Sequence, residues 1–354
     1  MTLRTEEIRV EGYERVVRAT DDETGLRAII SVHDTTLGPA LGGMRMWNYA
    51  SDDAAMTDVL RLSEGMTYKS AIARTGLGGG KSVIIGDAKK IKTPELMRSM
   101  GRFVDSLGGL YITAEDVNIG VRDLECVSET TRHVTGLSRE KGGSGNPSPY
   151  TAHGVFLGIK TCLADVFGSD DPRGRHVAIQ GVGAVARTLI DKLIAAGATV
   201  TATDIDEEKI ALVRENHPQV AWVEPDAIYD VACDVFAPCA LGAILDDGTL
   251  PRLSCKIVAG AANNQLADDR HGEMLLERGI LYAPDFVINA GGIVNVSCEF
   301  EPGGYDEDVA MKKISNIAEA LRSTFAHARA EGIDTNRAAE EVARKIVADA
   351  RAAK

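Results

Sequence analysis

No apolar run in the 354-residue sequence approaches the roughly 20 residues that a helix needs to cross a bilayer. The opening segment, MTLRTEEIRVEG, is charged throughout and lacks the apolar central stretch of a secretory signal peptide. We therefore expect a soluble protein of the cytoplasm.

An excess of basic residues is also absent. Lysine and arginine number 39 against 52 aspartates and glutamates, which gives a formal net charge of -13. Nucleic acids and anionic membranes are bound through clustered lysine and arginine. The charge balance argues against both partners. It leaves a small zwitterionic substrate open, because such a molecule responds to the local field of its pocket.

Paired cysteines and metal-ligand spacings are lacking as well. The six cysteines, at positions 126, 162, 233, 239, 255 and 298, include no CxxC pair, and no histidine or cysteine grouping has zinc-ligand spacing. In a chain of this kind we expect buried free thiols and no metal.

The length of the chain predicts two domains, and its composition, 44% hydrophobic and 26% charged, is that of a globular protein. The first 150 residues mix strand-like and helix-like stretches with three glycine-rich segments, 37–43, 76–81 and 142–149. The third segment, which holds two prolines, predicts a hinge or linker.

The last fifty residues have a helical pattern, with Thr335 as a candidate N-cap of the final helix. We expect these helices to pack back onto the first domain. The expected first domain is therefore residues 1–148 plus about 328–354, and the expected second domain is residues 149–327.

From residue 151 onward, strand-like and helix-like segments alternate. Helices are expected at 151–168, 185–196 and 206–216, and strands at 176–180, 199–203, 234–237, 256–259 and 280–282. This alternation predicts an α/β fold with a parallel, doubly wound sheet that is covered on both faces.

A dinucleotide-binding fingerprint lies between the first two of these strands. Residues 181–186, Gly-Val-Gly-Ala-Val-Ala, match G-x-G-x-x-G/A. The glycines permit a tight turn and close approach of a pyrophosphate to the start of the next helix. Asp204 follows 21 residues after Gly183, at the end of the next strand, where a carboxylate binds a ribose 2′-hydroxyl and repels a 2′-phosphate. The sequence therefore predicts NAD rather than NADP.

Two lysines on glycine-rich backbone stand twelve residues apart, Lys69 in GMTYKS and Lys81 in GGGKS. One cation could anchor a substrate carboxylate, while the other, with its proton affinity lowered by a neighbouring cation, could manage protons near neutral pH. A phosphate-binding loop is disfavoured, because Walker A would need glycine where Thr75 stands. Two surface lysines are the alternative explanation of this spacing.

An acidic partner is expected in the segment ITAEDV at 112–117. Asp116 follows an apolar stretch and suits a general acid/base, but from the residues alone Glu115 is an equal candidate.

These residues lie in stretches that closely resemble the Glu/Leu/Phe/Val dehydrogenase superfamily and, within it, the leucine dehydrogenases. The matching stretches span nearly the whole chain in the expected order: HDTTLGPALGG (33–43), GMTYK (65–69), GGGKSVIIGD (78–87), YITAEDV (111–117), GNPSP (145–149), APCALGA (237–243), AANNQL (261–266) and YAPDFVINAGG (282–292).

The resemblance implies a substrate-binding and oligomerisation domain, a Rossmann-type NAD-binding domain, and an active site in the cleft between them. It implies that Lys69 binds the substrate carboxylate, that Lys81 activates water and that Asp116 transfers protons. The other implied substrate-binding residues are Leu41, Gly42, Ala114, Asn263, Ile293 and Val296. The implied cofactor-binding residues are Arg45, Thr151, Gly181, Val182, Gly183, Ala184, Val185, Asp204 and Asn289.

The resemblance also implies the substrate class. Related glutamate dehydrogenases carry a lysine at the place of Leu41 and a serine at the place of Val296, which this chain lacks. An apolar pocket favours oxidative deamination of branched-chain L-amino acids, leucine above all, to 2-keto acids. Phenylalanine or valine dehydrogenase activity is the first alternative, since the segment 299–305 departs from typical leucine dehydrogenases, and a non-catalytic nucleotide-binding regulator is the second. A homo-oligomer, suspected to be an octamer, is implied as well.

Overall fold

The computed structural model describes residues 3–240 and 242–354, and the chain forms two compact units. Unit 1 comprises Met1–Asn146, Val296–Glu307 and Ala343–Lys354, and unit 2 comprises Pro147–Asn295 and Asp308–Val342. The units divide inside the third glycine-rich segment, two residues before the boundary expected from the sequence. The later segments that belong to unit 1 differ more from the expected ones. Residues 296–307 belong to unit 1, which was not expected, and of the expected segment 328–354 only residues 343–354 belong to it. Helical periodicity reveals which face of a helix is buried, but not which unit covers it.

Unit 1 is built on a six-stranded mixed sheet with the order β1-β2-β3-β5-β4-β6. Strands β1 to β3 and β5 pair antiparallel, whereas β4 pairs parallel with both β5 and β6. Strand β4 therefore lies between two strands that come later in the sequence. The bounds are β1 Arg4–Ile8, β2 Arg15–Asp21, β3 Leu26–Asp34, β4 Ala40–Trp47, β5 Gly78–Ile85 and β6 Tyr111–Glu115.

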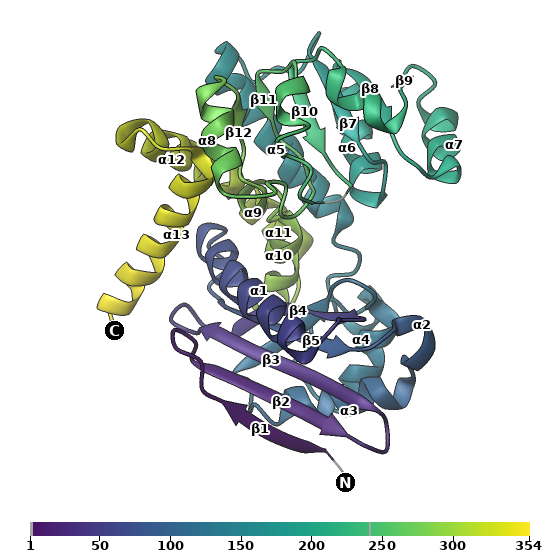
Figure 1. The fold of residues 1–354 in the computed structure, drawn as a ribbon, viewed down its shortest axis with the longest axis vertical. Coiled ribbons are helices and arrows are strands. Elements are labelled where there is room, and N and C mark those ends of the chain that lie inside the picture. Colours follow the sequence, from purple (N-terminus) through teal and green to yellow (C-terminus); the bar gives the residue numbers. More distant parts are fainter. Residues whose placement is uncertain (1–2, 241) are drawn as a thin grey trace. The chain divides into compact units, whose positions relative to one another are not determined.

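Helices cover both faces of this sheet (Figure 1). Alternate residues of β3 point to opposite sides: Ile29 packs with Ala55 and Val59 of α1, and Ile30 packs with a larger cluster that includes Phe103 of α3. The helices are α1 Asp52–Ile72, α2 Ala88–Ile91, α3 Pro94–Asp105 and α4 Val121–Ser128, with a short 3-10 turn η1 at Arg139–Lys141.

Helix α1 packs against β5 at a position that only glycine can occupy. A Cβ atom on Gly79 would lie 2.1 Å from the backbone nitrogen of Thr67 and 2.4 Å from its Cα atom. The missing side chain allows close approach of helix and strand. Since Lys69 and Lys81 each follow two residues after this contact, the contact positions the segments that carry both lysines.

Unit 2 contains a six-stranded parallel sheet with the order β12-β11-β10-β7-β8-β9. The order reverses direction at the neighbouring strands β7 and β10, which is the topological switch point where doubly wound folds bind ligands. The strands are β7 His176–Gln180, β8 Thr199–Thr203, β9 Ala221–Trp222, β10 Val235–Pro238, β11 Ile257–Val258 and β12 Leu281–Tyr282.

The helices and 3-10 turns that follow residue 147 complete the fold. They are α5 Ser148–Phe167, α6 Ala184–Ala195, α7 Glu207–Asn216, η2 Pro225–Asp230, η3 Leu250–Arg252, α8 Arg270–Glu277, α9 Asp285–Ile288, α10 Gly291–Ser297, η4 Cys298–Phe300, α11 Glu307–Ile314, α12 Asn316–Glu331 and α13 Thr335–Ala352. The predicted α/β class with a doubly wound parallel sheet is confirmed, and each predicted element of this half is present within three residues of its expected ends.

The N-cap predicted for the final helix is wrong by one residue. The carboxylate of Asp334 accepts hydrogen bonds from the backbone nitrogens of Asn336 (2.9 Å) and Arg337 (3.1 Å), so Asp334 caps α13. The hydroxyl of Thr335 instead donates to the carbonyl of Tyr282 at 2.7 Å. Both residue types are good N-caps, and a contact distant in sequence decided between them.

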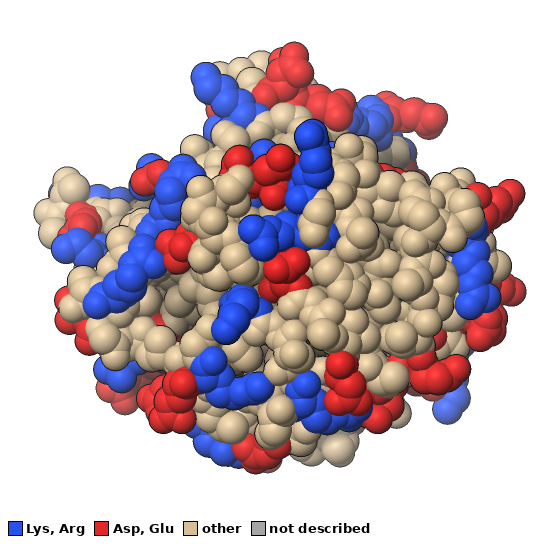
Figure 2. All heavy atoms as spheres, turned by 90° about the horizontal axis from the view of Figure 1, so that it is seen from above, with Lys and Arg blue, Asp and Glu red and all other residues tan. Residues whose placement is uncertain are grey.

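The described residues have free thiols, and the face of the molecule drawn in Figure 2 is of mixed charge. In the described part of the chain, no helix is long and apolar enough to span a membrane. All six cysteines are free thiols, and among residues 3–240 and 242–354 no cluster of His, Cys, Asp and Glu could hold a metal ion. On the face drawn in Figure 2, basic side chains lie beside acidic ones rather than gathering into one basic surface.

A substitution at the α1–β5 contact tests its importance. We expect Gly79→Ala to push α1 outward and to lower the free energy of unfolding by about 1–3 kcal/mol, as overpacked cores do. Gly65→Ala is the matched control: it lies in α1 itself with nothing within 4 Å of the added Cβ. It is expected to be neutral or to stabilise the protein by up to about 1 kcal/mol. Urea unfolding measures both, and equal midpoints would contradict the analysis.

Candidate active site

An ion pair in unit 1 joins a buried lysine to a partly buried aspartate. The Lys81 ammonium on β5 pairs with the Oδ2 atom of Asp116, which directly follows β6. The Lys81 side chain is 7% exposed and that of Asp116 21%. The structure thus brings together the two residues expected to perform the chemistry.

Glycines on the intervening strand allow this approach. Strand β4 separates β5 from β6, and a Cβ on Gly43 would lie 2.8 Å from the Cβ of Asp116. A Cβ on Gly42 would lie 1.7 Å from the carbonyl oxygen of Gly80. Side chains at these positions would occupy the space that the ion pair and its neighbouring backbone use. Gly42, an expected substrate-binding residue, therefore has a packing role, and its carbonyl accepts from the Tyr111 hydroxyl at 2.6 Å.

Burial and charge act in opposite directions on the pair. Burial lowers the pKa of Lys81, and Asp116 only partly opposes this effect. Burial alone would raise the pKa of Asp116, but the cations Lys81 and Arg45 hold that pKa below its usual value. The result is a carboxylate that stays ionised beside an amine that gives up its proton more readily than an exposed lysine.

Asp116, rather than Glu115, is the acidic residue that reaches Lys81. Consecutive residues at the end of a strand point to opposite faces. Glu115 is left in an environment where burial and then the charge of Asp116 raise its pKa. Sequence reasoning could not separate these two neighbours, because the choice depends on the face of β6.

A second acidic group, which the sequence analysis did not single out, lies behind the pair. Arg45 of β4 lies with its Nε atom 3.4 Å from Oδ2 of Asp116, and its Nη1 atom donates to Oδ2 of Asp58 at 2.9 Å. The hydroxyl of Tyr49 donates to the same Asp58 oxygen at 2.6 Å. Arg45, expected at the cofactor, is thus engaged by two carboxylates within unit 1.

The remaining expected residues of unit 1 lie on the same elements. Lys69 is half-buried in the last turn of α1. Leu41 of β4, Ala114 of β6 and Val296 are buried, with 1%, 9% and 8% of their surface exposed. An apolar side-chain set therefore accompanies the charged pair in this unit.

The predicted fingerprint forms a tight turn in unit 2. Gly181 has φ +89°, and a Cβ there would lie 2.6 Å from the Cβ of Ala240. Gly183 immediately precedes α6, and nothing lies within 4 Å of the position of its missing Cβ. Ala186 is buried, as the close packing of helix and strand requires. The start of the helix therefore has open space beside Gly183, where a helix N-terminus favours an anion.

Asp204 holds this turn in place. Its carboxylate accepts hydrogen bonds from the backbone nitrogens of Val182 (2.7 Å) and Asp206 (3.0 Å). At the ends of β7 and β8, Oε1 of Gln180 and the hydroxyl of Thr203 are buried without a hydrogen-bond partner among the described residues. An open, donor-rich helix start beside a carboxylate and unsatisfied polar atoms fits a dinucleotide.

Two of the expected asparagines contact each other in unit 2. The Nδ2 atom of Asn289 donates to Oδ1 of Asn263 at 2.8 Å and to the carbonyl of Ala261 at 3.1 Å. Gln265, which the sequence analysis did not assign, is fully buried. Its amide donates to the carbonyls of Gly260 (3.0 Å) and Ala262 (2.9 Å). It thereby fixes the loop on which Asn263 lies. Of the other two expected residues, Ile293 is buried, and Thr151 lies beside the neighbour of Ile293 in sequence: a Cβ on Gly292 would lie 2.7 Å from the Thr151 hydroxyl.

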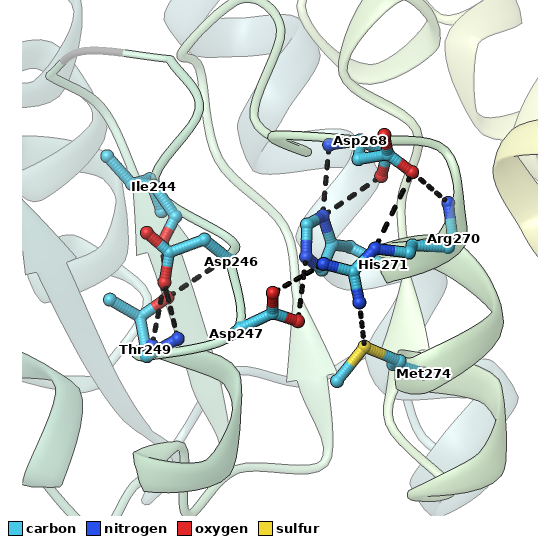
Figure 3. Close-up of polar contacts among 9 residues, drawn as sticks. Ile244, Asp246, Asp247, Thr249, Asp268, Arg270, His271 and Met274 are labelled. Carbon is cyan, nitrogen blue, oxygen red and sulfur yellow. Dashed lines mark hydrogen bonds and ion pairs between the residues drawn. The ribbon is translucent and has the colours of Figure 1, made fainter.

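The loops after β10 and β11 are fastened to each other further along (Figure 3). Leu245 and Leu266 form a parallel bridge between them. Asp246 accepts from the backbone nitrogen of Thr249 at 2.9 Å, and Arg270 forms an ion pair with Asp247. The bridge and the ion pair connect the segment that follows Asn263 to the loop after β10.

Comparisons with known proteins agree with this geometry. Residues 12–133 match the family model described as "Glu/Leu/Phe/Val dehydrogenase, dimerisation domain", and residues 142–354 match "Glutamate/Leucine/Phenylalanine/Valine dehydrogenase". The chain is 52% identical to a leucine dehydrogenase of Thermoactinomyces intermedius over 336 residues, which cover 95% of this chain and 91% of that protein.

Two further relatives differ in the substrate they are named for. A valine dehydrogenase of Streptomyces virginiae is 45% identical over 342 residues, which cover 96% of this chain and 95% of that protein. The crystal structure of an L-tryptophan dehydrogenase from Nostoc punctiforme superposes with a TM-score of 0.84 at 42% identity, covering 96% of this chain and 97% of that one. The chain belongs to the Glu/Leu/Phe/Val dehydrogenase family of amino-acid dehydrogenases.

Proposed function

We propose that this protein catalyses the reversible, NAD-dependent oxidative deamination of L-leucine and other branched-chain L-amino acids to 2-keto acids and ammonia. The observation that carries the chemistry is the Lys81–Asp116 ion pair, because a buried amine with a lowered pKa beside an ionised carboxylate suits proton transfer near neutral pH. Identities near 50% with leucine dehydrogenases over almost the full chain support the substrate class.

In the forward direction the substrate gives up a hydride, takes up one water and releases ammonium. A nicotinamide ring, when bound, accepts the hydride from Cα of the amino acid. The products are then the 2-keto acid, ammonium, the reduced cofactor and one proton, so that atoms and charge balance. This transfer requires substrate and cofactor to be held close together in the right orientation.

The residues of unit 1 divide the work on the substrate. Lys69 binds the substrate carboxylate as an ammonium. Lys81, in its neutral form, takes a proton from the water that attacks the substrate iminium carbon. Asp116 then relays protons to the departing nitrogen. The burial of Lys81 serves this step, because an exposed lysine is almost entirely protonated at neutral pH.

The residues of unit 2 would hold the cofactor. The N–H groups of Gly183, Ala184 and Val185 at the start of α6 suit a pyrophosphate, while those of Gly181 and Val182 hold the turn by donating to Thr203 and Asp204. Asp204, beyond its bonds to the turn, has lone pairs left for a ribose 2′-hydroxyl and would repel a 2′-phosphate, which favours NAD over NADP. Thr151, Asn289 and Arg45 are the further proposed cofactor contacts.

The substrate side chain meets apolar residues in this proposal. Leu41, Ala114, Val296 and Ile293 are all buried and uncharged. A substrate with a charged side chain would lose the hydration of that charge without a partner, at a cost of several kcal/mol. Asn263 would bind the polar end of the substrate.

Valine dehydrogenase activity is the second candidate, and 45% identity to valine dehydrogenases is the observation that favours it. One methylene changes discrimination in an apolar pocket by only about 1–3 kcal/mol. Initial rates with leucine, isoleucine, valine and phenylalanine separate these possibilities.

The proposal extends to organisation and place. Residues 1–148 with the C-terminal segment from about 328 would serve substrate binding and assembly, and 149–327 would bind NAD. We propose a homo-oligomer, an octamer by resemblance, that acts in the cytoplasm, where NAD and free amino acids are both available.

The first prediction concerns catalysis. The protein should reduce NAD in the presence of L-leucine, and Lys81→Ala should lower kcat about 100- to 10,000-fold, which is the usual contribution of a proton-transfer group. Lys90→Ala is the matched control, since the Lys90 side chain is 78% exposed, and its rate should equal that of the unmodified protein. Full turnover by folded Lys81→Ala would refute the assigned role.

The second prediction concerns cofactor choice. Asp204→Asn keeps an oxygen that accepts from Val182 but removes the charge that repels a 2′-phosphate. We expect the ratio of kcat/KM for NAD to that for NADP to fall about tenfold or more, equivalent to about 1.4 kcal/mol. Asp206→Asn changes a nearby carboxylate that caps α7 and should leave the ratio unchanged. An unaltered ratio in Asp204→Asn would remove the basis for preferring NAD.

A further inference from the structure

Four charged side chains in unit 1 alternate in sign along one continuous line. Asp58 contacts Arg45, Arg45 contacts Asp116, and Asp116 contacts Lys81. They come from α1, β4, the end of β6 and β5, so that four separate elements of the unit contribute one group each. The proposed chemistry uses the last two groups and gives no task to Asp58.

Asp58 is held in one orientation. Its Oδ2 atom accepts from Arg45 Nη1 at 2.9 Å and from the Tyr49 hydroxyl at 2.6 Å, and its side chain is 17% exposed. The other oxygen lies 3.5 Å from Nη2 of Arg61, which is 65% exposed. Burial and the Asp58 hydrogen bond raise the pKa of Tyr49, so Tyr49 stays a donor. Such a carboxylate is oriented more firmly than a mobile surface acid.

We propose that Asp58 is a positioning residue for the deamination reaction: through Arg45 it fixes and electrically balances the carboxylate of Asp116 beside Lys81. The inference rests on the proposed function, which supplies the reaction that Asp116 and Lys81 perform. Asp58 itself touches neither of these two groups in the described contacts and acts by way of the guanidinium.

The physical reason lies in how Arg45 is shared. Its Nη1 donates a hydrogen bond to Asp58, whereas its Nε lies 3.4 Å from Asp116 in an ion pair that lacks hydrogen-bond geometry. Asp58 neutralises the guanidinium charge and keeps it from closing fully on Asp116. Without that charge, Arg45 would stand as an unbalanced cation next to the catalytic pair.

The sign of the expected change follows from the charges that face Lys81. These are Asp116, Arg45 and Asp58; Tyr111, whose pKa burial raises, stays neutral like Tyr49, and Arg61 points to solvent. Removing the negative charge of Asp58 makes the surroundings of Lys81 more positive and lowers its pKa further. The neutral amine then forms at lower pH, and so the rising limb of the kcat/KM profile moves to lower pH.

The experiment compares Asp58→Asn, Asp58→Glu and Asp53→Asn. The first substitution keeps the size and an acceptor without the charge, and we expect its rising limb to move down by about one pH unit. Asp58→Glu retains the charge and should keep the profile close to that of the unmodified protein. Asp53 lies exposed on the same helix, and Asp53→Asn should leave the profile unchanged.

A second readout needs no catalysis. The rate at which acetic anhydride labels Lys81, followed by peptide mass spectrometry over a pH series, reports the titration of that amine directly. We expect the labelling midpoint to fall in Asp58→Asn and to recover in Asp58→Glu. KM for leucine should change little, since Lys69 binds the substrate carboxylate.

The outcomes separate this inference from the proposed function. A thermal midpoint that falls while both pH profiles stay fixed would mean that Asp58 merely ties α1 to β4, and would overturn the inference. Absence of amino-acid dehydrogenase activity in the unmodified protein would instead overturn the proposed function. In that case the labelling series would still decide whether Asp58 controls the charge state of Lys81.

Discussion

The candidate site of unit 1 depends on holding a charged pair largely out of water. Removing an ammonium and a carboxylate from solvent is costly unless each has a partner in good geometry. Lys81 and Asp116 balance each other's charge, and the strand between them, β4, has no side chains at Gly42 and Gly43, so that they can meet. Arg45 and Asp58 extend the pairing to α1, so the charge set is balanced as a whole. The glycines of this unit therefore matter for the ion pair as well as for chain flexibility. Side chains on β4 at Gly42 and Gly43 would collide with Gly80 and Asp116.

Glycine has a different role in unit 2, where it shapes the turn that precedes α6. A dinucleotide needs exposed N–H groups, whereas a folded chain tends to satisfy every donor it has. The turn at Gly181 leaves the start of α6 open, and Asp204 supports the turn by accepting from Val182. Asp204, which is expected to bind the ribose, therefore also supports the turn that is expected to bind the phosphates. A change at Asp204 would affect both cofactor preference and the local fold. The buried, unsatisfied atoms of Gln180 and Thr203 are consistent with a surface prepared for a polar ligand.

The sequence alone predicts those parts of the structure that depend on residues close together in the chain. The fingerprint turn, the alternating strands of unit 2 and the two lysines are patterns of neighbouring residues, and their periodicity or spacing predicts their structure. The Lys81–Asp116 pair depends on the order β5-β4-β6, which places strands together out of sequence order. The links from Arg45 to Asp58 and from Gln265 to its loop depend on side-chain directions that no pattern specifies. Thr335 lost its expected cap role to Asp334 for the same reason, since its hydroxyl found a partner on β12.

The relatives named for leucine, valine and tryptophan share one fold family with this chain at identities from 42% to 52%. Such different side chains cannot be distinguished by a charged pair that acts only at the amino-acid Cα, where these substrates are alike. In the proposed site the choice among them lies with apolar surfaces such as Leu41 and Val296, whose contribution per methylene is small. On this proposal the proton-transfer chemistry and the substrate preference depend on different residues. The charged side chains from Asp58 to Lys81 can stay constant while the apolar residues around the substrate side chain change. On this proposal the chemistry is common to the family, whereas the preferred substrate of each member has to be measured.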